Sequence, residues 1–228
     1  MHRPLRLTID CNALVHNWRW LQDKAGVPAG AAIKADGYGL GARLTMQALY
    51  EAGCRDFFVS TWAEAEELGA VPEDMSIVVL HGVAADDVDA ALASAARPVL
   101  NSIEQVDRWK QVGSGLPCDV MIDTGMNRLG LRPDESGSLD GLAIDTLHSH
   151  LACADENHAL NGKHLERFRE VAATVPAKRY SFANSAGICL GRDYSFDLVR
   201  PGLALYGGIP RREAEGSIRQ VAHVEAQI

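Results

Sequence analysis

The sequence predicts an α/β fold, a closed (β/α)8 barrel of the TIM type. Eight short apolar or β-rich runs recur at fairly regular intervals, and most of the intervals between them have helical spacing. Strands that alternate with helices form right-handed βαβ units and a parallel sheet. Eight such units within about 180 residues favour closure into a barrel over an open sheet. The length of 228 residues suits one large domain of this kind.

The predicted barrel strands follow one another in the order 30–35, 56–60, 76–82, 97–101, 118–123, 145–151, 179–184 and 198–207. Helical spacing predicts helices over 42–52, 62–68, 85–94, 103–112 and 158–173. The helical signal is weakest over 131–144 and 185–197. The order of elements therefore predicts where each strand of the barrel ends.

Both ends of the chain extend beyond the predicted barrel. A strand and a helix over 5–25 come first, with Asp10 or Asn12 as the expected N-cap. At the other end, a polar linker leads to 218–228, which has the pattern of a strand that stops with the chain. We expect residues 1–210 to form the barrel domain and 211–228 to form a linker and the start of a truncated β-domain. The alternative is a short closing strand that packs outside the barrel.

Composition and charge exclude several classes of protein. The formal net charge is −8 and no Lys/Arg cluster is present, so we expect no nucleic-acid partner. No run approaches the roughly 20 apolar residues that span a bilayer, so we expect no membrane partner. The N-terminus alternates like a strand and does not resemble a secretory signal. The five scattered cysteines form no CxxC pair, which favours reduced thiols in a cytoplasmic protein.

A lysine at the end of the first predicted strand is the most informative single residue. The run from Ala31 to Gly41 reads AAIKADGYGLG, so Lys34 follows three small or apolar residues and precedes a glycine-rich turn. Desolvation of an unpaired ammonium is costly. A lysine there serves either as a point charge for phosphate or as an amine that attacks a carbonyl. The alternative is a side chain that extends outward from the strand end into solvent.

Other polar residues follow the carboxyl ends of the later strands, where barrel enzymes build their active sites. Arg128 follows the fifth strand, His150 lies on the sixth, Ser185 follows the seventh and Arg200 lies on the eighth. Among the residues at this rim, the cationic side chains Lys34, Arg128 and Arg200 outnumber the acids that would neutralise them. The rim therefore predicts an anionic ligand.

The loops after the seventh and eighth strands are the expected phosphate site, as in many barrels. They supply the Ser185 hydroxyl and the Gly202 and Leu203 amides, and Tyr38 adds a phenolic donor from the first strand. Glycine at 202 allows the backbone to approach closely. Spacing alone fits Ser185 equally well as a helix N-cap. A phosphate site beside a reactive lysine points to pyridoxal 5′-phosphate.

Five segments of the chain resemble the signature segments of bacterial alanine racemases, in family order and at family-like spacing. They are IKADGYG at 33–39, IDTGMNRLG at 122–130, HSHLACAD at 148–155, NSA at 184–186 and VRPGLALYG at 199–207. The resemblance implies a cytoplasmic homodimeric isomerase that depends on pyridoxal 5′-phosphate. Such an enzyme interconverts L- and D-alanine and supplies D-alanine for the cell-wall peptidoglycan.

The resemblance also implies a role for each matching residue. Lys34 holds the cofactor as a Schiff base and acts as one of two bases, and Arg200 faces the pyridine nitrogen. His150 orients Arg200, and Arg128 reaches the cofactor's phenolic oxygen and the substrate carboxylate. The residues that would hold the phosphate are Tyr38, Ser185, Gly202 and Leu203. No metal ligand is implied.

The sequence departs from the family pattern at Leu40, Leu151 and Gly187, where relatives usually have histidine, an aromatic residue and often alanine. A larger departure concerns the second base, which in the family is a tyrosine from a C-terminal β-domain, supplied across the dimer interface. None of Tyr180, Tyr194 and Tyr206 matches that second-base tyrosine. We therefore expect this form to bind the cofactor and to racemise poorly.

Two other functions are compatible with parts of the sequence. One is a non-catalytic barrel that binds and buffers pyridoxal 5′-phosphate, which the short length favours. The other is a metal-dependent hydrolase, because imidazole and carboxylate suit zinc. Its candidate ligands are His148, His150, Asp155, His158 and His164.

Overall fold

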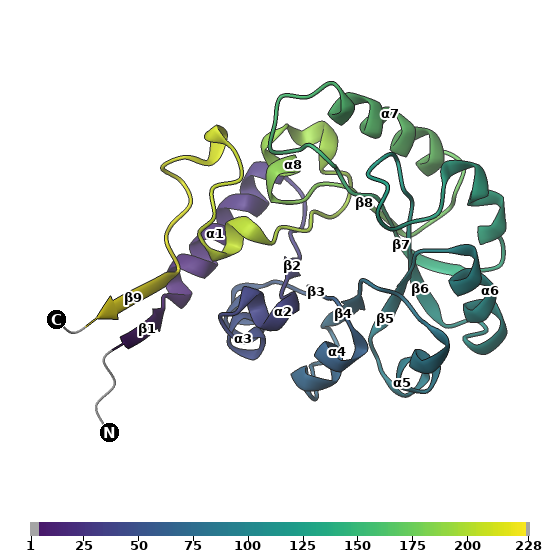
Figure 1. Ribbon diagram of the computed structural model, residues 1–228, viewed down its shortest axis with the longest axis horizontal. Coiled ribbons are helices and arrows are strands. Elements are labelled where there is room, and N and C mark those ends of the chain that lie inside the picture. The colour runs from purple at the N-terminus through teal and green to yellow at the C-terminus, as the bar shows by residue number, and fades with distance from the viewer. Residues whose placement is uncertain (1–4, 227–228) are drawn as a thin grey trace.

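The computed structural model describes residues 5–226, and its centre is a sheet of seven parallel strands that curls round on itself (Figure 1). The strands pair in chain order. They are β2 (Ala31–Ala32), β3 (Asp56–Val59), β4 (Ser76–Val79), β5 (Arg97–Leu100), β6 (Pro117–Met121), β7 (Ala143–His148) and β8 (Arg179–Ser181). The helices lie on the outside of the curl, as the predicted alternation of strands and helices requires (Figure 1).

An extended segment after β8 closes the barrel in the position of the eighth strand. Leu198 bridges to Ser181 of β8, and Val199 bridges to Ala29 just before β2. The Gly30 amide donates to the Val199 carbonyl at 2.9 Å, and the Ala32 amide donates to the Pro201 carbonyl at 2.9 Å. These bonds join the first and last strand positions, so the predicted (β/α)8 barrel is confirmed.

The predicted eighth strand over 198–207 is too long. Pro201 has no amide hydrogen to donate to a ladder. The chain then turns at Gly202 into the 3₁₀ helix η4 (Leu203–Tyr206). The first strand is also shorter than predicted, because β2 ends before Lys34 and a helical turn begins there.

Most helices match their predicted ranges. The helices α3 (Ala42–Ala52), α4 (Trp62–Leu68) and α6 (Ile103–Val112) have the predicted bounds, and α7 (Leu160–Ala172) falls within its range. The range 85–94 divides into η1 (Ala85–Asp87) and α5 (Val88–Ala93). The regions of weak signal contain η2 (Pro133–Leu139), α8 (Ser185–Cys189) and η3 (Arg192–Tyr194).

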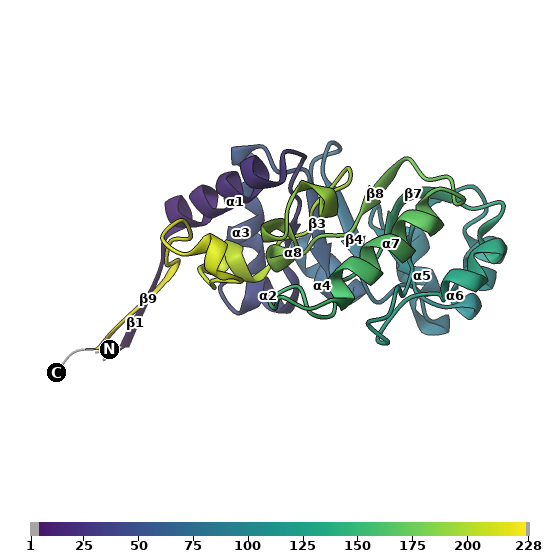
Figure 2. The same cartoon turned by 90° about the horizontal axis from the view of Figure 1, so that it is seen from above.

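The two ends of the described chain form a separate two-stranded ribbon that projects from the barrel (Figure 2). The strand β1 (Leu5–Ile9) leads into α1 (Cys11–Ala25), and Asp10 caps this helix by accepting a bond from the Ala13 amide at 2.9 Å. After η5 (Arg212–Ala214), β9 (Ala222–Ala226) pairs antiparallel with β1. The last two positions of the predicted strand 218–228 lie outside the described residues.

The inside of the barrel has an apolar layer near the cavity and a charged layer below it. The apolar layer consists of Ala32, Phe58, Val78, Val99, Met121 and Leu198. The charged layer, called here the ionic belt, consists of Asp56, Arg97, Asp119, Asp145 and Arg179. Side chains alternate along a strand. The outward-facing residues of β6, Cys118 and Val120, therefore belong to the core under the helices. None of the helices within residues 5–226 combines the length and apolar character needed to cross a membrane.

Candidate active site

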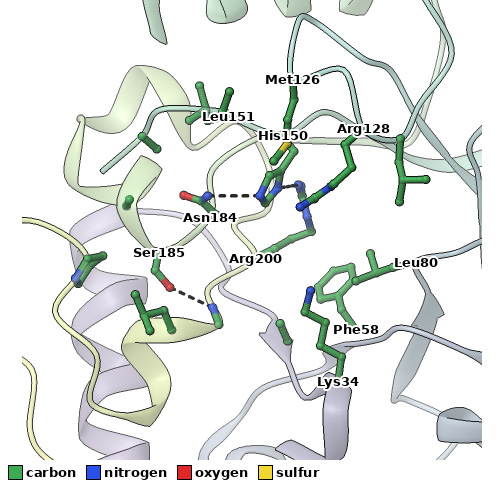
Figure 3. A pocket seen from close by; sticks show the side chains of 18 of the residues that line it. Lys34, Phe58, Leu80, Met126, Arg128, His150, Leu151, Asn184, Ser185 and Arg200 are labelled. Atoms are coloured by element: carbon green, nitrogen blue, oxygen red, sulfur yellow. Dashed lines mark hydrogen bonds between the residues drawn. The ribbon is translucent and has the colours of Figure 1, made fainter. Parts of the chain in front are cut away.

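All eight residues predicted from the sequence as site residues line one cavity of about 580 Å³. The cavity lies at the carboxyl ends of the barrel strands, and Figure 3 shows its side chains converging from opposite walls. The eight residues are Lys34, Tyr38, Arg128, His150, Ser185, Arg200, Gly202 and Leu203. The predicted grouping is therefore present, and the role of each residue remains a prediction.

Lys34 projects into the cavity beside Phe58 (Figure 3). Within residues 5–226 no carboxylate forms an ion pair with its ammonium group. The backbone after Lys34 is fixed by Glu64, which accepts a bond from the Ala35 amide at 3.0 Å and another from the Ser60 amide at 2.6 Å. The amine is therefore directed into the cavity by a fixed backbone and is free of a competing acid.

The turn that follows Lys34 is left-handed, which the sequence did not reveal. In the five-residue helical turn α2 (Lys34–Tyr38), φ is 51° at Ala35, 50° at Asp36 and 56° at Tyr38. Each such non-glycine residue costs roughly 1–2 kcal/mol. Asp36 offsets part of this cost by accepting a bond from the Ala42 amide at 2.8 Å. The turn closes on itself within five residues and so returns Tyr38 to the cavity wall.

Tyr38 meets the opposite side of the cavity at Gly202. Its ring stacks on Tyr206 with 4.7 Å between the ring centroids. A Cβ atom at Gly202 would overlap the Tyr38 hydroxyl, so only glycine permits this approach. The positions that the sequence assigned to one phosphate site therefore do come together.

Ser185 organises the amides at this corner. It is buried, and its Oγ accepts bonds from the Gly202 amide at 3.0 Å and the Ala204 amide at 3.2 Å. The sequence assigned the Leu203 amide to the phosphate, which stays a prediction, and the Ala204 amide of η4 is a donor to Ser185 that the sequence did not name. The N-cap of α8 is Asn184, whose Oδ1 accepts from the Gly187 amide at 2.8 Å, so the alternative role of Ser185 as the cap is wrong.

Arg200 is a buried cation whose hydrogen-bond partners are all neutral. Its Nη1 donates to Ser181 Oγ at 2.5 Å, and its Nη2 donates to the Ser149 carbonyl at 2.6 Å. Nη2 also lies 3.5 Å from His150 Nδ1. Burial lowers the pKa of Arg200 to about 10, which still leaves the guanidinium charged at neutral pH. The cavity therefore has a fixed positive charge in its wall.

His150 is neutral at physiological pH. Burial, together with the charges of Arg200, Arg128 and Lys34, lowers its pKa to about 3. Its Nε2 lies 3.4 Å from Asn184 Nδ2, on the side away from Arg200 (Figure 3). The ring therefore contacts Arg200 without adding charge, and its role in orienting Arg200 stays a prediction.

Arg128 reaches the cavity from the loop after β6 (Figure 3). The loop is held by Asp123, whose Oδ1 accepts bonds from the three amides of residues 125–127 at 2.8, 2.8 and 3.1 Å. From the other side, Arg167 Nη1 donates to the Thr124 carbonyl at 2.9 Å. A loop held from both sides thus presents the Arg128 side chain to the cavity.

Several lining residues had no role in the sequence interpretation. They are Phe58, Ser60, Leu80, His81, Met121, Met126, Leu129 and Asn184. His81 could have been found by its position just after a strand, and its Nε2 lies 2.9 Å from Asp87 Oδ2. The apolar residues carry no signal beyond their place at strand ends.

The histidines proposed as metal ligands are separated in the structure. His148 lies inside the barrel with its Nε2 2.9 Å from Asp119 Oδ2, whereas His150 contacts Arg200. His164 is buried in α7. Over residues 5–226, no three His, Cys, Asp or Glu side chains are grouped as a metal site. The structure therefore provides no ligand set for the hydrolase alternative.

We expect the buried histidines to make the protein less stable as the pH falls below 6.5. The ordinary pKa of histidine is 6.5, whereas burial lowers the pKa of His148 to about 4 and that of His150 to about 3. Between these values the unfolded chain binds more protons than the folded one. The free energy of unfolding should therefore fall by up to about 1.4 kcal/mol per pH unit for each histidine.

Urea unfolding at pH 7 and pH 5 measures this change. The variant His150→Gln isolates one contribution, because its unfolding free energy should depend less steeply on pH over this range. A free energy of unfolding that is constant between pH 7 and pH 5 would contradict the assignment of neutral buried rings.

The comparisons with known proteins agree with one another. A model of the family "Alanine racemase, N-terminal domain" matches residues 9–210. The alanine racemase of Methylobacterium nodulans is 43% identical, and the match covers 98% of this chain and 64% of that protein. The alanine racemase of Rhodospirillum rubrum is 41% identical over 97% of this chain and 63% of that protein. The chain thus spans about 64% of the length of the relatives it matches.

Solved structures show the same relationship. The alanine racemase from Bartonella henselae, whose structure has covalently bound pyridoxal phosphate, superposes with a TM-score of 0.92 at 37% identity. That match covers 100% of this chain and 67% of the other. The biosynthetic alanine racemase from Pseudomonas aeruginosa superposes with a TM-score of 0.84 at 30% identity, over 97% of this chain and 65% of the other.

Proposed function

Because this chain belongs to the alanine racemase family, we propose that its cavity binds pyridoxal 5′-phosphate and serves the interconversion of L- and D-alanine. The observation that carries the proposal is that Lys34, Arg200 and the Ser185 corner line one cavity. We propose further that the enzyme is a cytoplasmic homodimer and that it supplies D-alanine for the cell wall.

The residues present fit this cofactor. An unpaired Lys34 amine lines the cavity that also contains the hydroxyl of Ser185, so an aldehyde and a phosphate on one molecule both find a partner. The close approach of Gly202 and Tyr38 brings the Tyr38 hydroxyl to the corner where the Gly202 and Ala204 amides donate to Ser185 Oγ, so several donors gather where an anion would lie. The Arg200 charge has no carboxylate partner and favours an anionic ligand with an unprotonated ring nitrogen.

Each residue then has a definite task. The bound cofactor supplies an electron sink that makes the Cα proton of an attached amino acid acidic. Lys34 would hold the aldehyde carbon until the substrate amine replaces it there, and its freed amine would then move the Cα proton on its own face. Arg128 binds the substrate carboxylate, and the fixed charge of Arg200 lowers the pKa of the pyridine nitrogen by about 1–3 units. Through this effect Arg200 would favour return of the proton to Cα.

Racemisation needs two proton-transfer groups on opposite faces of Cα, because one group returns the proton to the side from which it came. Lys34 provides one of them. The family resemblance assigns the other to a tyrosine of a partner subunit's β-domain, and the five matching segments of this chain include no such residue. We therefore propose that these 228 residues support exchange with retention more readily than inversion.

The test measures two rates on the 228-residue chain with added cofactor. Deuterium entry at Cα of L-alanine reports exchange, and formation of D-alanine reports inversion. We expect exchange to be faster than inversion by about 10²–10⁴-fold, the usual contribution of a general base. Equal rates would contradict the need for an outside base. Cofactor binding without any exchange would instead favour the non-catalytic carrier, and no binding would refute the proposal.

A further inference from the structure

Within residues 5–226, Arg200 forms no ion pair with a carboxylate. Its guanidinium is buried and contacts only the Ser181 hydroxyl, the Ser149 carbonyl and the neutral His150 ring. A buried cation is costly unless an opposite charge compensates it. Asp155 also lines the cavity but forms no ion pair with Arg200 within residues 5–226, and the acid whose charge acts on Arg200 is Asp119, in another layer of the barrel.

Asp119 is placed to provide that charge from below. It faces the barrel interior from β6 and is fully buried. Its Oδ2 lies 2.9 Å from His148 Nε2 on β7, and His148 is in register with Ser181 on β8. Ser181 in turn accepts the bond from Arg200. Asp119, His148 and Ser181 thus lie on three neighbouring strands, between the ionic belt and Arg200.

The ion pairs of the ionic belt leave Asp119 with a single cationic partner. Arg179 bridges Asp56 and Asp145, and Arg97 bridges Asp145 and Asp119. The exposed Lys178 adds a third cation, which lies 3.4 Å from Asp145 and does not pair with Asp119. The charge of Asp119 also acts on Arg200, because it raises the pKa of the guanidinium against the effect of burial.

His148 has a defined protonation state between the acid and the arginine. It is fully buried, and burial lowers its pKa to about 4, so the ring is neutral. A neutral ring that faces a carboxylate through Nε2 must carry its proton on Nε2. Its Nδ1 is then an acceptor, buried and without a hydrogen-bond partner within residues 5–226.

We propose that Asp119 is a positioning residue for Arg200: it fixes the Nε2–H tautomer of His148 and supplies the negative charge that compensates the buried guanidinium. If the cavity binds pyridoxal 5′-phosphate, Asp119 also sets the electrostatic potential at the cofactor ring. This second part rests on the function proposed above. Asp119 itself touches neither substrate nor cofactor, because the apolar layer and Arg200 lie between the belt and the cavity.

The variant Asp119→Asn tests the first part. Its Oδ1 would keep the bonds from the Arg97 Nε and the Thr146 amide, both at 3.2 Å, and its amide nitrogen would face His148. An amide donor requires an acceptor, so the proton of His148 should move to Nδ1. The matched control is Asp145→Asn, which removes one charge from the same belt without contacting His148.

The readout is the ¹⁵N NMR spectrum of the histidine rings in the chain without cofactor. We expect His148 to carry its proton on Nε2 in the unmodified chain and in the control, and on Nδ1 in Asp119→Asn. A proton on Nδ1 in the unmodified chain would overturn the proposal even if the variant does not fold. An unchanged tautomer in a folded Asp119→Asn would overturn it as well.

The second readout is the pH midpoint of the visible absorption of added pyridoxal 5′-phosphate. Loss of the Asp119 charge makes the potential at the cofactor more positive, so the midpoint should fall by about one pH unit. Lys34, Arg128, His150 and Arg200 act on the same region and are unchanged in both variants. An equal shift in Asp145→Asn would overturn the proposal. Failure of the unmodified chain to bind the cofactor would refute only the proposed function, because the tautomer is measured without it.

Discussion

Replacement of Lys34 by alanine is expected to abolish covalent attachment of pyridoxal 5′-phosphate and to lower Cα exchange by at least about 10⁴-fold. The cavity then keeps its phosphate corner and its fixed cation but loses the amine that binds the aldehyde. No other lysine lines the cavity. Visible absorption of the purified protein after gel filtration measures attachment, and deuterium entry into L-alanine measures exchange.

The fold should be unaffected by this substitution. Lys34 is half-buried, and the bond that fixes its turn uses the Ala35 amide and Glu64 rather than the lysine side chain. We expect the free energy of unfolding to change by less than about 1 kcal/mol. Lys163→Ala, on the exposed face of α7, is the matched control and should retain the absorption. Absorption that persists in Lys34→Ala and survives gel filtration would show that another residue binds the cofactor.

Replacement of Arg200 by glutamine is expected to lower the rate of proton exchange about 10²-fold and to change the outcome of the reaction. Glutamine keeps one amide donor for the Ser149 carbonyl and removes the charge. Without a fixed cation, the pKa of the pyridine nitrogen rises by about 1–3 units and the cofactor becomes a stronger electron sink. More substrate should then be lost to transamination, which pyruvate formation from alanine measures.

Arg200→Lys separates charge from geometry. Lysine keeps a cation but cannot make the two-pronged contact with Ser181 and Ser149. We expect its ratio of pyruvate formation to proton exchange to stay near that of the unmodified chain, although its exchange rate falls. A ratio that rises equally in both variants would mean that the geometry of Arg200, and not its charge, controls the outcome.

The sequence was sufficient to identify polar site residues that lie at the end of a predicted strand. Lys34, Arg128, Ser185 and Arg200 were found in this way, because parallel strands deliver their carboxyl ends to one rim. The alternation of strands and helices predicted the barrel, and side-chain caps such as Thr61 and Ser102 begin α4 and α6 where the predicted helices begin. Local chemistry and topology agree at these positions.

The rest depended on tertiary contacts that spacing does not encode. The left-handed turn at Ala35–Tyr38 is unfavourable for its own residues and persists because Glu64 and Tyr206 hold it from other elements. The Ala204 amide joins that of Gly202 in bonding Ser185, because η4 begins immediately after Gly202. Asp119 and His148 appear on their strands as polar residues, and only the closed barrel shows that they lie beneath Arg200.

The most direct test of the central claim, that Lys34 is the residue that binds pyridoxal 5′-phosphate in this cavity, is reduction of the loaded chain with borohydride followed by peptide mass mapping. We expect the visible colour to disappear and one reduced cofactor to be fixed to the peptide that contains Lys34. A cofactor fixed to a different lysine, or a chain that binds none under saturating cofactor, would contradict the account.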